Sequence, residues 1–195
     1  MSKSIEAKAY QLKVTLRGTR PPIWRRLEVR GDTTLGRLHN VLQVAMGWTN
    51  SHMHQFTARG TSYGQAGPDL QLEREDEDKC RLDQVLKKPR DRMVYEYDFG
   101  DGWTHDIVVE KLVPVIPGRR RYPAVTAGRR ACPPEDCGGI RGYYHLLEVL
   151  ENPADPEYEE LAEWCGLDFQ PEKFDAGEIN RAFHGGWSPT DSNAL

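Results

Sequence analysis

The sequence predicts an α+β protein with a β-grasp-like mixed sheet, in which a hairpin, a helix and a strand are followed by a second hairpin. Three observations support this. Apolar and polar residues alternate over two segments, 10–29 and 93–112, as is typical of half-buried strands. A helical stripe of apolar residues occupies 35–46, between them. Helical spacing returns at 142–183, so we expect a helical C-terminal third.

Length and composition predict one globular domain. The chain has 195 residues, of which 38% are hydrophobic and 29% charged, and its net charge is −4. A chain of this length can bury a sizeable core unaided, and an acidic balance argues against a general nucleic-acid coat. We expect a single domain over 1–195: sheet and main helix at 1–113, two loops at 114–141, helices at 142–183 and a tail at 184–195.

The sequence gives no indication of a membrane or of export. The first residues lack the apolar stretch of a signal peptide, and no run approaches the roughly 18 apolar residues needed to span a bilayer. The cysteines, Cys80, Cys132, Cys137 and Cys165, follow no disulfide spacing. We therefore expect a cytoplasmic protein that does not bind membranes.

In the first half, strands are predicted at 10–16 and 23–29, with a break between them at 18–22. Thr33 or Thr34 can cap the following helix, because a threonine oxygen accepts a hydrogen bond from a first-turn amide. Gly47 is placed to end that helix. A third strand is predicted at 51–58, and the charged run 73–78 is expected to form a solvated loop.

A short helix is expected at 82–86, before the second hairpin. In its first strand, Met93, Tyr95, Tyr97 and Phe99 share one face; in its second, Trp103, His105, Ile107 and Val109 share one. Asp101-Gly102 is a strong turn signal, because both residues tolerate positive φ.

The segment 114–130 is expected to be a loop with five arginines, Arg119, Arg120, Arg121, Arg129 and Arg130. One interpretation is a solvated basic loop. The other is a surface that binds a protein or nucleic-acid partner, chiefly through Arg119, Arg120 and Arg121. From residue 151 onward there are eleven acidic residues and two basic ones, so this acidic part can instead neutralise the arginines within the molecule.

Two short segments contain the densest functional groups: the aspartate hairpin, residues 95–105, and the cysteine loop, residues 132–139. The loop has two prolines, an acid pair and two glycines, which suits a rigid loop folded over the hairpin. The candidate site residues are Asp98, Asp101, Trp103, His105, Glu135, Asp136 and Cys137.

A divalent metal is the cofactor that this set allows. Asp98, Asp101 and His105 offer the carboxylate and imidazole ligands that hard cations accept, and His52, His54, Glu135 and Asp136 can add ligands if their loops fold close. Against this, aspartates in Gly-rich turns often bind their own backbone, and a strand histidine among aromatics is commonly a core residue.

Other chemistries have less support. Cys132 and Cys137, completed by Cys165 or His145, would make a structural zinc site, although zinc ribbons have two tight cysteine pairs. Asp-Phe-Gly at 98–100 also occurs in protein kinases, but the chain lacks their Gly-rich loop and His-Arg-Asp motif.

Several motifs in fixed order resemble the plasmid pRi-type open-reading-frame-three-like family, which includes TnpR-like passenger proteins of insertion elements. The motifs are Pro-Ile-Trp-Arg at 22–25, Tyr-Asp-Phe-Gly-Asp-Gly-Trp-Thr-His at 97–105, Tyr-Pro at 122–123, Pro-Pro-Glu-Asp-Cys-Gly-Gly at 133–139 and Gly-Tyr at 142–143. The resemblance implies a compact α+β domain and an association with mobile DNA. Relatives often carry an acid before the motif histidine, where this chain has Thr104.

Three functional hypotheses follow. The first, which we favour, is a non-catalytic binding or interaction module. The second is a metal-dependent hydrolase or nuclease centred on Asp98, Asp101 and His105. The third is that the hairpin and the loop are purely structural. No complete catalytic set can be assembled from the sequence, which is why the first is preferred.

Overall fold

The computed structural model describes residues 8–65, 74–115, 118 and 121–185. Within them, one eight-stranded sheet has the strand order β5-β4-β3-β6-β7-β1-β2-β8, accompanied by five helices. The predicted α+β class is confirmed, whereas the β-grasp-like arrangement and the helical C-terminal third stay predictions. In this part of the chain, no helix is long and apolar enough to cross a bilayer.

The strands are β1 (Lys8–Leu16), β2 (Trp24–Arg30), β3 (His54–Ala58), β4 (Thr61–Gly64), β5 (Glu75–Asp76), β6 (Arg92–Tyr97), β7 (Trp103–Pro114) and β8 (Ala124–Arg129). The helices are α1 (Leu35–Met46), α2 (Leu82–Val85), α3 (Gly139–Leu150), α4 (Tyr158–Cys165) and α5 (Ala176–His184). Neighbouring strands pair antiparallel, except that β4 and β5 are parallel.

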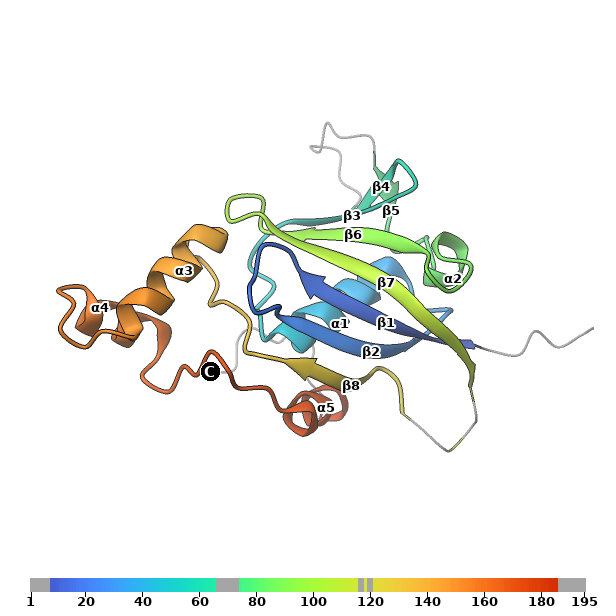
Figure 1. The fold of residues 1–195 in the computed structure, drawn as a ribbon. Coiled ribbons are helices and arrows are strands. Elements are labelled where there is room, and N and C mark those ends of the chain that lie inside the picture. Colours follow the sequence, from blue (N-terminus) through green and yellow to red (C-terminus); the bar gives the residue numbers. More distant parts are fainter. Residues whose placement is uncertain (1–7, 66–73, 116–117, 119–120, 186–195) are drawn as a thin grey trace, which may run out of the picture.

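The core lies between α1 and one face of the sheet, as Figure 1 shows. The helix α1 forms where predicted. The Thr34 Oγ1 atom accepts a hydrogen bond from the Arg37 amide at 3.3 Å, and Gly47 ends the helix with φ 83°. The alternate residues of β1, such as Leu12 and Val14, are completely buried against it. The apolar face of the strands and the apolar face of α1 therefore pack together in one core layer.

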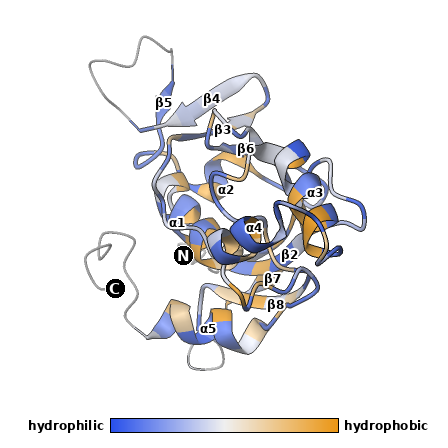
Figure 2. Cartoon of the chain, turned by 90° about the vertical axis from the view of Figure 1, so that its left-hand side faces the viewer, coloured by the Kyte–Doolittle hydropathy of each residue, from blue (hydrophilic) through white to orange (hydrophobic). Residues whose placement is uncertain are grey.

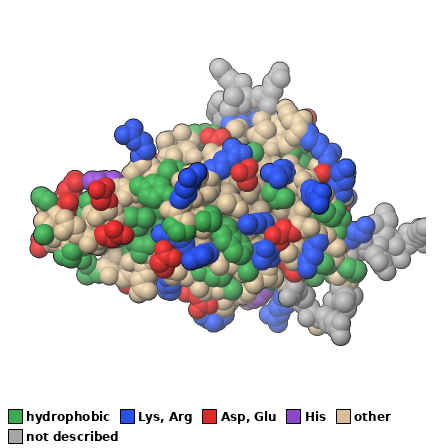
Figure 3. All heavy atoms as spheres, in the orientation of Figure 1, with side chains coloured by type: hydrophobic (Ala, Val, Ile, Leu, Met, Phe, Trp, Pro, Cys, Tyr) green, Lys and Arg blue, Asp and Glu red, His purple; other side chains and the backbone are tan. Residues whose placement is uncertain are grey.

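The opposite face of the sheet carries charged side chains. Lys13 and Arg26 lie over the Trp24 ring, with their charged groups 5.3 and 5.2 Å from its centroid, and Arg26 also forms an ion pair with Glu110. In Figure 3, Lys and Arg side chains are spread over the visible face, with hydrophobic side chains between them. The polar half of the alternating pattern therefore lies on this face.

The structure corrects two predicted loops. Residues 124–129 form β8, which pairs with β2. Because Val125 is its one fully buried residue, the sequence lacks the apolar alternation that marks a strand. The acidic run is also structured in part: β5 pairs with β4, and Glu77 is 3% exposed because it binds His54. Residue 73 of that run lies outside the described residues.

The last helices lie at the periphery of the sheet. Figures 1 and 2 show α3 and α4 beyond one end of it, and α5 beside β8. Asp175 caps α5 by accepting hydrogen bonds from the Gly177 and Glu178 amides. Asn180 of α5 both donates to and accepts from the Val125 backbone, at 2.9 and 2.8 Å. Within the described residues β8 is an edge strand of the sheet, and the Asn180 side chain satisfies part of its exposed backbone.

Candidate functional site

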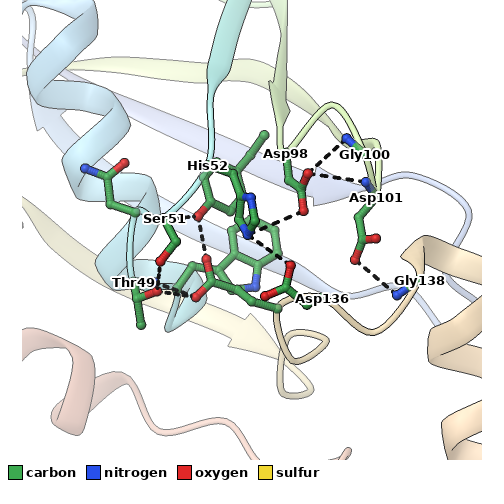
Figure 4. Close-up of polar contacts among 12 residues, drawn as sticks. Thr49, Ser51, His52, Asp98, Gly100, Asp101, Asp136 and Gly138 are labelled. Atoms are coloured by element: carbon green, nitrogen blue, oxygen red, sulfur yellow. Dashed lines mark hydrogen bonds and ion pairs between the residues drawn. The ribbon is translucent and has the colours of Figure 1, made fainter.

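One histidine and two aspartates converge where three connecting segments meet. His52 precedes β3, Asp98 follows β6, and Asp136 lies in the cysteine loop before α3. One ligand atom from each lies within 4.8 Å of the others, and the described residues contain no other group of three His, Cys, Asp or Glu side chains this close. Figure 4 shows the His52 ring between the two carboxylates.

The spacing suits a shared cation. His52 Nε2 lies 3.1 Å from Asp136 Oδ1 and 3.7 Å from Asp98 Oδ2. Ligands about 2.1 Å from one ion are separated by roughly 3.0–4.2 Å, depending on the angle between them. The Nε2 atom is buried and makes no hydrogen bond of good geometry with any described residue. A protonated His52 paired with both carboxylates is the competing explanation.

Local backbone geometry positions both aspartates. Asp98 and Asp136 have left-handed φ values of 56° and 60°, and nearby Asn50 has 61°. Aspartate and asparagine tolerate this region better than most residues, which explains their presence at these positions. Asp98 Oδ1 accepts hydrogen bonds from the Gly100 and Asp101 amides at 2.9 and 3.4 Å. Its Oδ2 atom is therefore the one that faces His52.

Glu135 fastens the cysteine loop to the sheet. Its carboxylate accepts a hydrogen bond from the Tyr97 hydroxyl and another from the Thr49 amide at 3.0 Å. Next to it, the Trp48 indole donates to the Pro133 carbonyl at 3.0 Å. Burial, followed by the hydrogen bond to Glu135, raises the pKa of Tyr97. Glu135 is thus a structural anchor that places Asp136 beside His52.

Asp101 and the glycines complete the contact between the hairpin and the loop. Asp101 Oδ2 accepts a hydrogen bond from the Gly138 amide at 3.2 Å, and a Cβ atom on Gly139 would lie 2.5 Å from the Asp101 carbonyl oxygen. The expected folding of the loop over the hairpin is therefore observed. Burial, then the charges of Asp101 and Asp136, raise the pKa of Cys137 to about 12, so its thiol stays protonated at neutral pH.

The predicted grouping of Asp98 with Asp101 and His105 is not found. His105 points into the core with Trp103, and both side chains are 0% exposed. The His105 ring centroid lies 5.4 Å from that of Trp48 and 5.5 Å from that of Tyr95, and burial lowers its pKa to about 4. Its place is taken by His52, which the sequence offered only as an additional ligand.

Two further residues depart from their predicted positions. Phe99, expected to share a strand face with Tyr95 and Tyr97, lies in the turn and is 42% exposed. His54, offered as an additional ligand, is buried and binds Glu77 at 2.8 Å. The pairing of β3 with β6 ends at Tyr97, which leaves Phe99 beyond the strand, and the partner of His54 is distant in sequence.

The cysteines do not assemble a zinc site. In the described residues, no group of three potential ligands within 4.8 Å contains a cysteine. Cys132 is buried, with its sulfur 3.1 Å from Met46 Sδ and 3.2 Å from Arg25 Nη2. Burial raises the pKa of the Cys132 thiol, although the Arg25 guanidinium partly opposes this shift, and a raised pKa disfavours the thiolate that zinc requires.

The arginines predicted to bind a partner are only partly described. Arg119 and Arg120 lie outside the described residues, and Arg121 is exposed. Arg129 ends β8, and Arg130 is buried with its guanidinium 2.7 Å from Glu172. The acidic C-terminal part therefore neutralises at least one arginine of the predicted basic loop within the molecule.

A family model described as "Plasmid pRiA4b ORF-3-like protein" matches residues 8–178. The chain belongs to this family. The match confirms the family resemblance carried by the hairpin and loop motifs, which contain Asp98 and Asp136. The link to passenger genes and mobile elements stays a prediction.

Two relatives in this comparison have no assigned function. The uncharacterized protein y4hQ of Sinorhizobium fredii is 38% identical over 180 residues, covering 90% of this chain and 91% of its own length. The crystal structure of a protein of unknown function, MM3350 from Methanosarcina mazei Go1, matches with a TM-score of 0.81 and 37% identity, covering 88% of this chain and 97% of its own. Function must therefore be argued from the site.

Proposed function

We propose that the protein is a non-catalytic binding module in which His52, Asp98 and Asp136 hold one divalent cation. The convergence of these three side chains within 4.8 Å carries the proposal. Divalent cations such as Zn²⁺ and Fe²⁺ accept carboxylate and imidazole ligands together, and with three protein ligands they keep further coordination positions open. An oxygen atom of a ligand or partner can occupy those positions, so the cation provides the means of binding.

The surrounding groups favour binding over catalysis. A nucleophile or general base must be free to reach the substrate. Glu135 is hydrogen-bonded to Tyr97 and Thr49, and the Cys137 thiol is protonated because its pKa is about 12. Asp101 is bound to the Gly138 amide. These neighbours hold the site in shape and offer little for chemistry.

A metal-dependent hydrolase or nuclease is the second candidate. It is favoured by the number of ligands, because three protein ligands and an open position for water are typical of catalytic zinc sites. A bound metal lowers the pKa of its water and so supplies a nucleophile without an activated side chain. The two candidates share the cation and differ in whether a product is formed.

Elemental analysis and metal titration test the shared cation. Purified protein, stripped with chelator and titrated with Mg²⁺, Mn²⁺ or Zn²⁺, is expected to bind one ion. Asp98→Asn and Asp136→Asn should each weaken binding about 100-fold, because each removes a charged ligand of a three-ligand site. Asp101→Asn is the matched control: it changes a nearby aspartate outside the group, and its side-chain oxygen can still accept the hydrogen bond from the Gly138 amide. The metal affinity of this variant should therefore stay close to wild type.

Absence of saturable binding by all three metals would refute the cation site and leave the protonated His52 explanation. Equal losses in Asp101→Asn and Asp98→Asn would also contradict it, because Asp101 does not belong to the group of three ligands. A phosphodiester screen with the loaded protein distinguishes the two candidates. Turnover that disappears in Asp98→Asn and Asp136→Asn would establish the hydrolase and replace the binding module.

A further inference from the structure

A second potential binding site is the cavity between α3 and α4. Its volume is about 330 Å³, which is within the usual range for pockets that hold small molecules. The cavity is bounded by the cysteine loop and by the facing sides of the two helices. Its lining includes apolar Leu146, Leu161 and Trp164, and polar Asp136, His145 and Glu160.

The charged lining of this cavity is acidic. Asp136 and Glu160 contribute carboxylates, and none of the described residues that line it is Lys or Arg. Asp136 faces His52, whereas the Glu160 carboxylate has no hydrogen bond or ion pair within the described residues. Acidic side chains also gather at this end of the molecule in Figure 3. The cavity therefore favours a positively charged group over an anion.

The apolar lining offers an aromatic surface beside those charges. Trp164 is 47% exposed, although it is one of the largest apolar side chains in the chain. An indole face attracts cations and also packs against flat apolar groups. Leu146 is 2% exposed, so the α3 side of the cavity is well-packed. The Nε2 atom of His145 lies 3.1 Å from Glu157 Oε2, so this imidazole nitrogen already has a partner.

We propose that the α3–α4 cavity binds a small organic cation, an ammonium or guanidinium group attached to an apolar or aromatic body. The cationic group lies near Glu160 and Asp136, and the body packs against Trp164 and Leu161. Such a ligand satisfies the free carboxylate and covers the exposed indole at once. This site needs no metal, so the proposal goes beyond the proposed function and can be tested in metal-free protein.

Titration of the full chain with three matched ligands tests this site. In chelator-containing buffer, 2-phenylethylamine, neutral 2-phenylethanol and anionic 3-phenylpropionate are added while the indole N–H resonance of Trp164 is followed by NMR. The resonance is identified by its loss in Trp164→Phe. The amine is expected to bind at least about 10-fold more tightly than the alcohol, because only the amine carries a charge for the carboxylates and the indole face.

Variants locate the binding. Glu160→Gln should weaken the amine about 5-fold and leave the alcohol unchanged, because one exposed carboxylate is removed. Glu159→Gln is the control, since Glu159 is an exposed neighbour on α4 that does not line the cavity. Equal affinity for amine and alcohol, stronger binding of the anion, equal losses in both variants, or no shift at millimolar amine would each overturn the proposal.

Discussion

Acidification from about pH 7.5 to about pH 5.5 is expected to lower the free energy of unfolding by about 3 kcal/mol through two buried histidines. His39 and His105 are 2% and 0% exposed. Burial, with a smaller contribution from neighbouring His54, lowers the pKa of His39 from 6.5 to about 3. Burial likewise lowers the pKa of His105 from 6.5 to about 4.

The direction follows from the protons that each state binds. In the unfolded chain, both imidazoles become protonated as the pH falls below 6.5, whereas in the folded protein they stay neutral until about pH 3 and about pH 4. The unfolded state therefore binds more protons in this window, and stability falls with pH. Each histidine contributes about 1.4 kcal/mol per pH unit below its unfolded pKa.

The contacts of His39 agree with a neutral ring. Its Nε2 atom lies 2.6 Å from Asn50 Oδ1, which can only accept, so Nε2 must carry the hydrogen. Its Nδ1 atom lies 2.8 Å from the Tyr95 hydroxyl, which can donate to it. The His54 ring is stacked on it at a centroid distance of 3.5 Å. Protonation would break this arrangement.

Two phenylalanine variants separate the histidines in urea unfolding at both pH values. Within the described part of the chain, the ring nitrogens of His105 make no hydrogen bond of good geometry. His105→Phe should therefore keep the stability at neutral pH and remove about half of the stability loss on acidification. His39→Phe removes two hydrogen bonds and should lower stability at neutral pH by about 1–3 kcal/mol. An unchanged pH dependence in His105→Phe would contradict the assignment.

Local patterns were sufficient to predict the elements whose signals lie within one segment. The apolar stripe of α1 and its flanking Thr34 and Gly47 specify a complete helix, and alternation specifies β1, β2, β6 and β7. The strand β8 was missed because it is recognised through pairing with β2, which comes from a distant part of the chain. Glu77 was expected in solvent because its partner His54 is also distant in sequence.

The candidate site was predictable in its segments and only partly in its residues. Asp98 and Asp136 lie in the two segments richest in functional groups, and the structure brings these segments together. Identifying His52 rather than His105 as the histidine of the site requires the turn register, which the sequence does not specify. One sequence signal indicates that His105 is a core residue: it shares its face with Trp103 and Ile107, and such an apolar face is usually buried.

Gly142→Ala is expected to lower the free energy of unfolding by about 3 kcal/mol or more. Gly142 lies in the first turn of α3, where a Cβ atom would be 1.7 Å from the Cys137 carbonyl oxygen and 2.7 Å from its carbon. Those atoms are backbone, so no side-chain rotation relieves the overlap. Either the cysteine loop or the first turn of the helix must move.

The same substitution should disable the proposed cation site without altering any of its ligands. Asp136 immediately precedes Cys137, so displacement of this loop carries the carboxylate away from His52. Metal affinity should therefore fall together with stability in Gly142→Ala. Arg141→Ala is the matched control, because Arg141 is an exposed neighbour in the same helix, and both quantities should stay near their wild-type values.

Measuring the free energy of unfolding and the metal affinity on each variant separates loss of packing from loss of a metal ligand. Asp136→Asn should lose the cation and retain most of the stability, because this side chain is 69% exposed. Gly142→Ala should lose both, because the loop that presents the ligand is held by close backbone packing against α3. If Gly142→Ala instead kept wild-type stability and metal affinity, the tight contact between loop and helix would be wrong, and with it the placement of Asp136 beside His52.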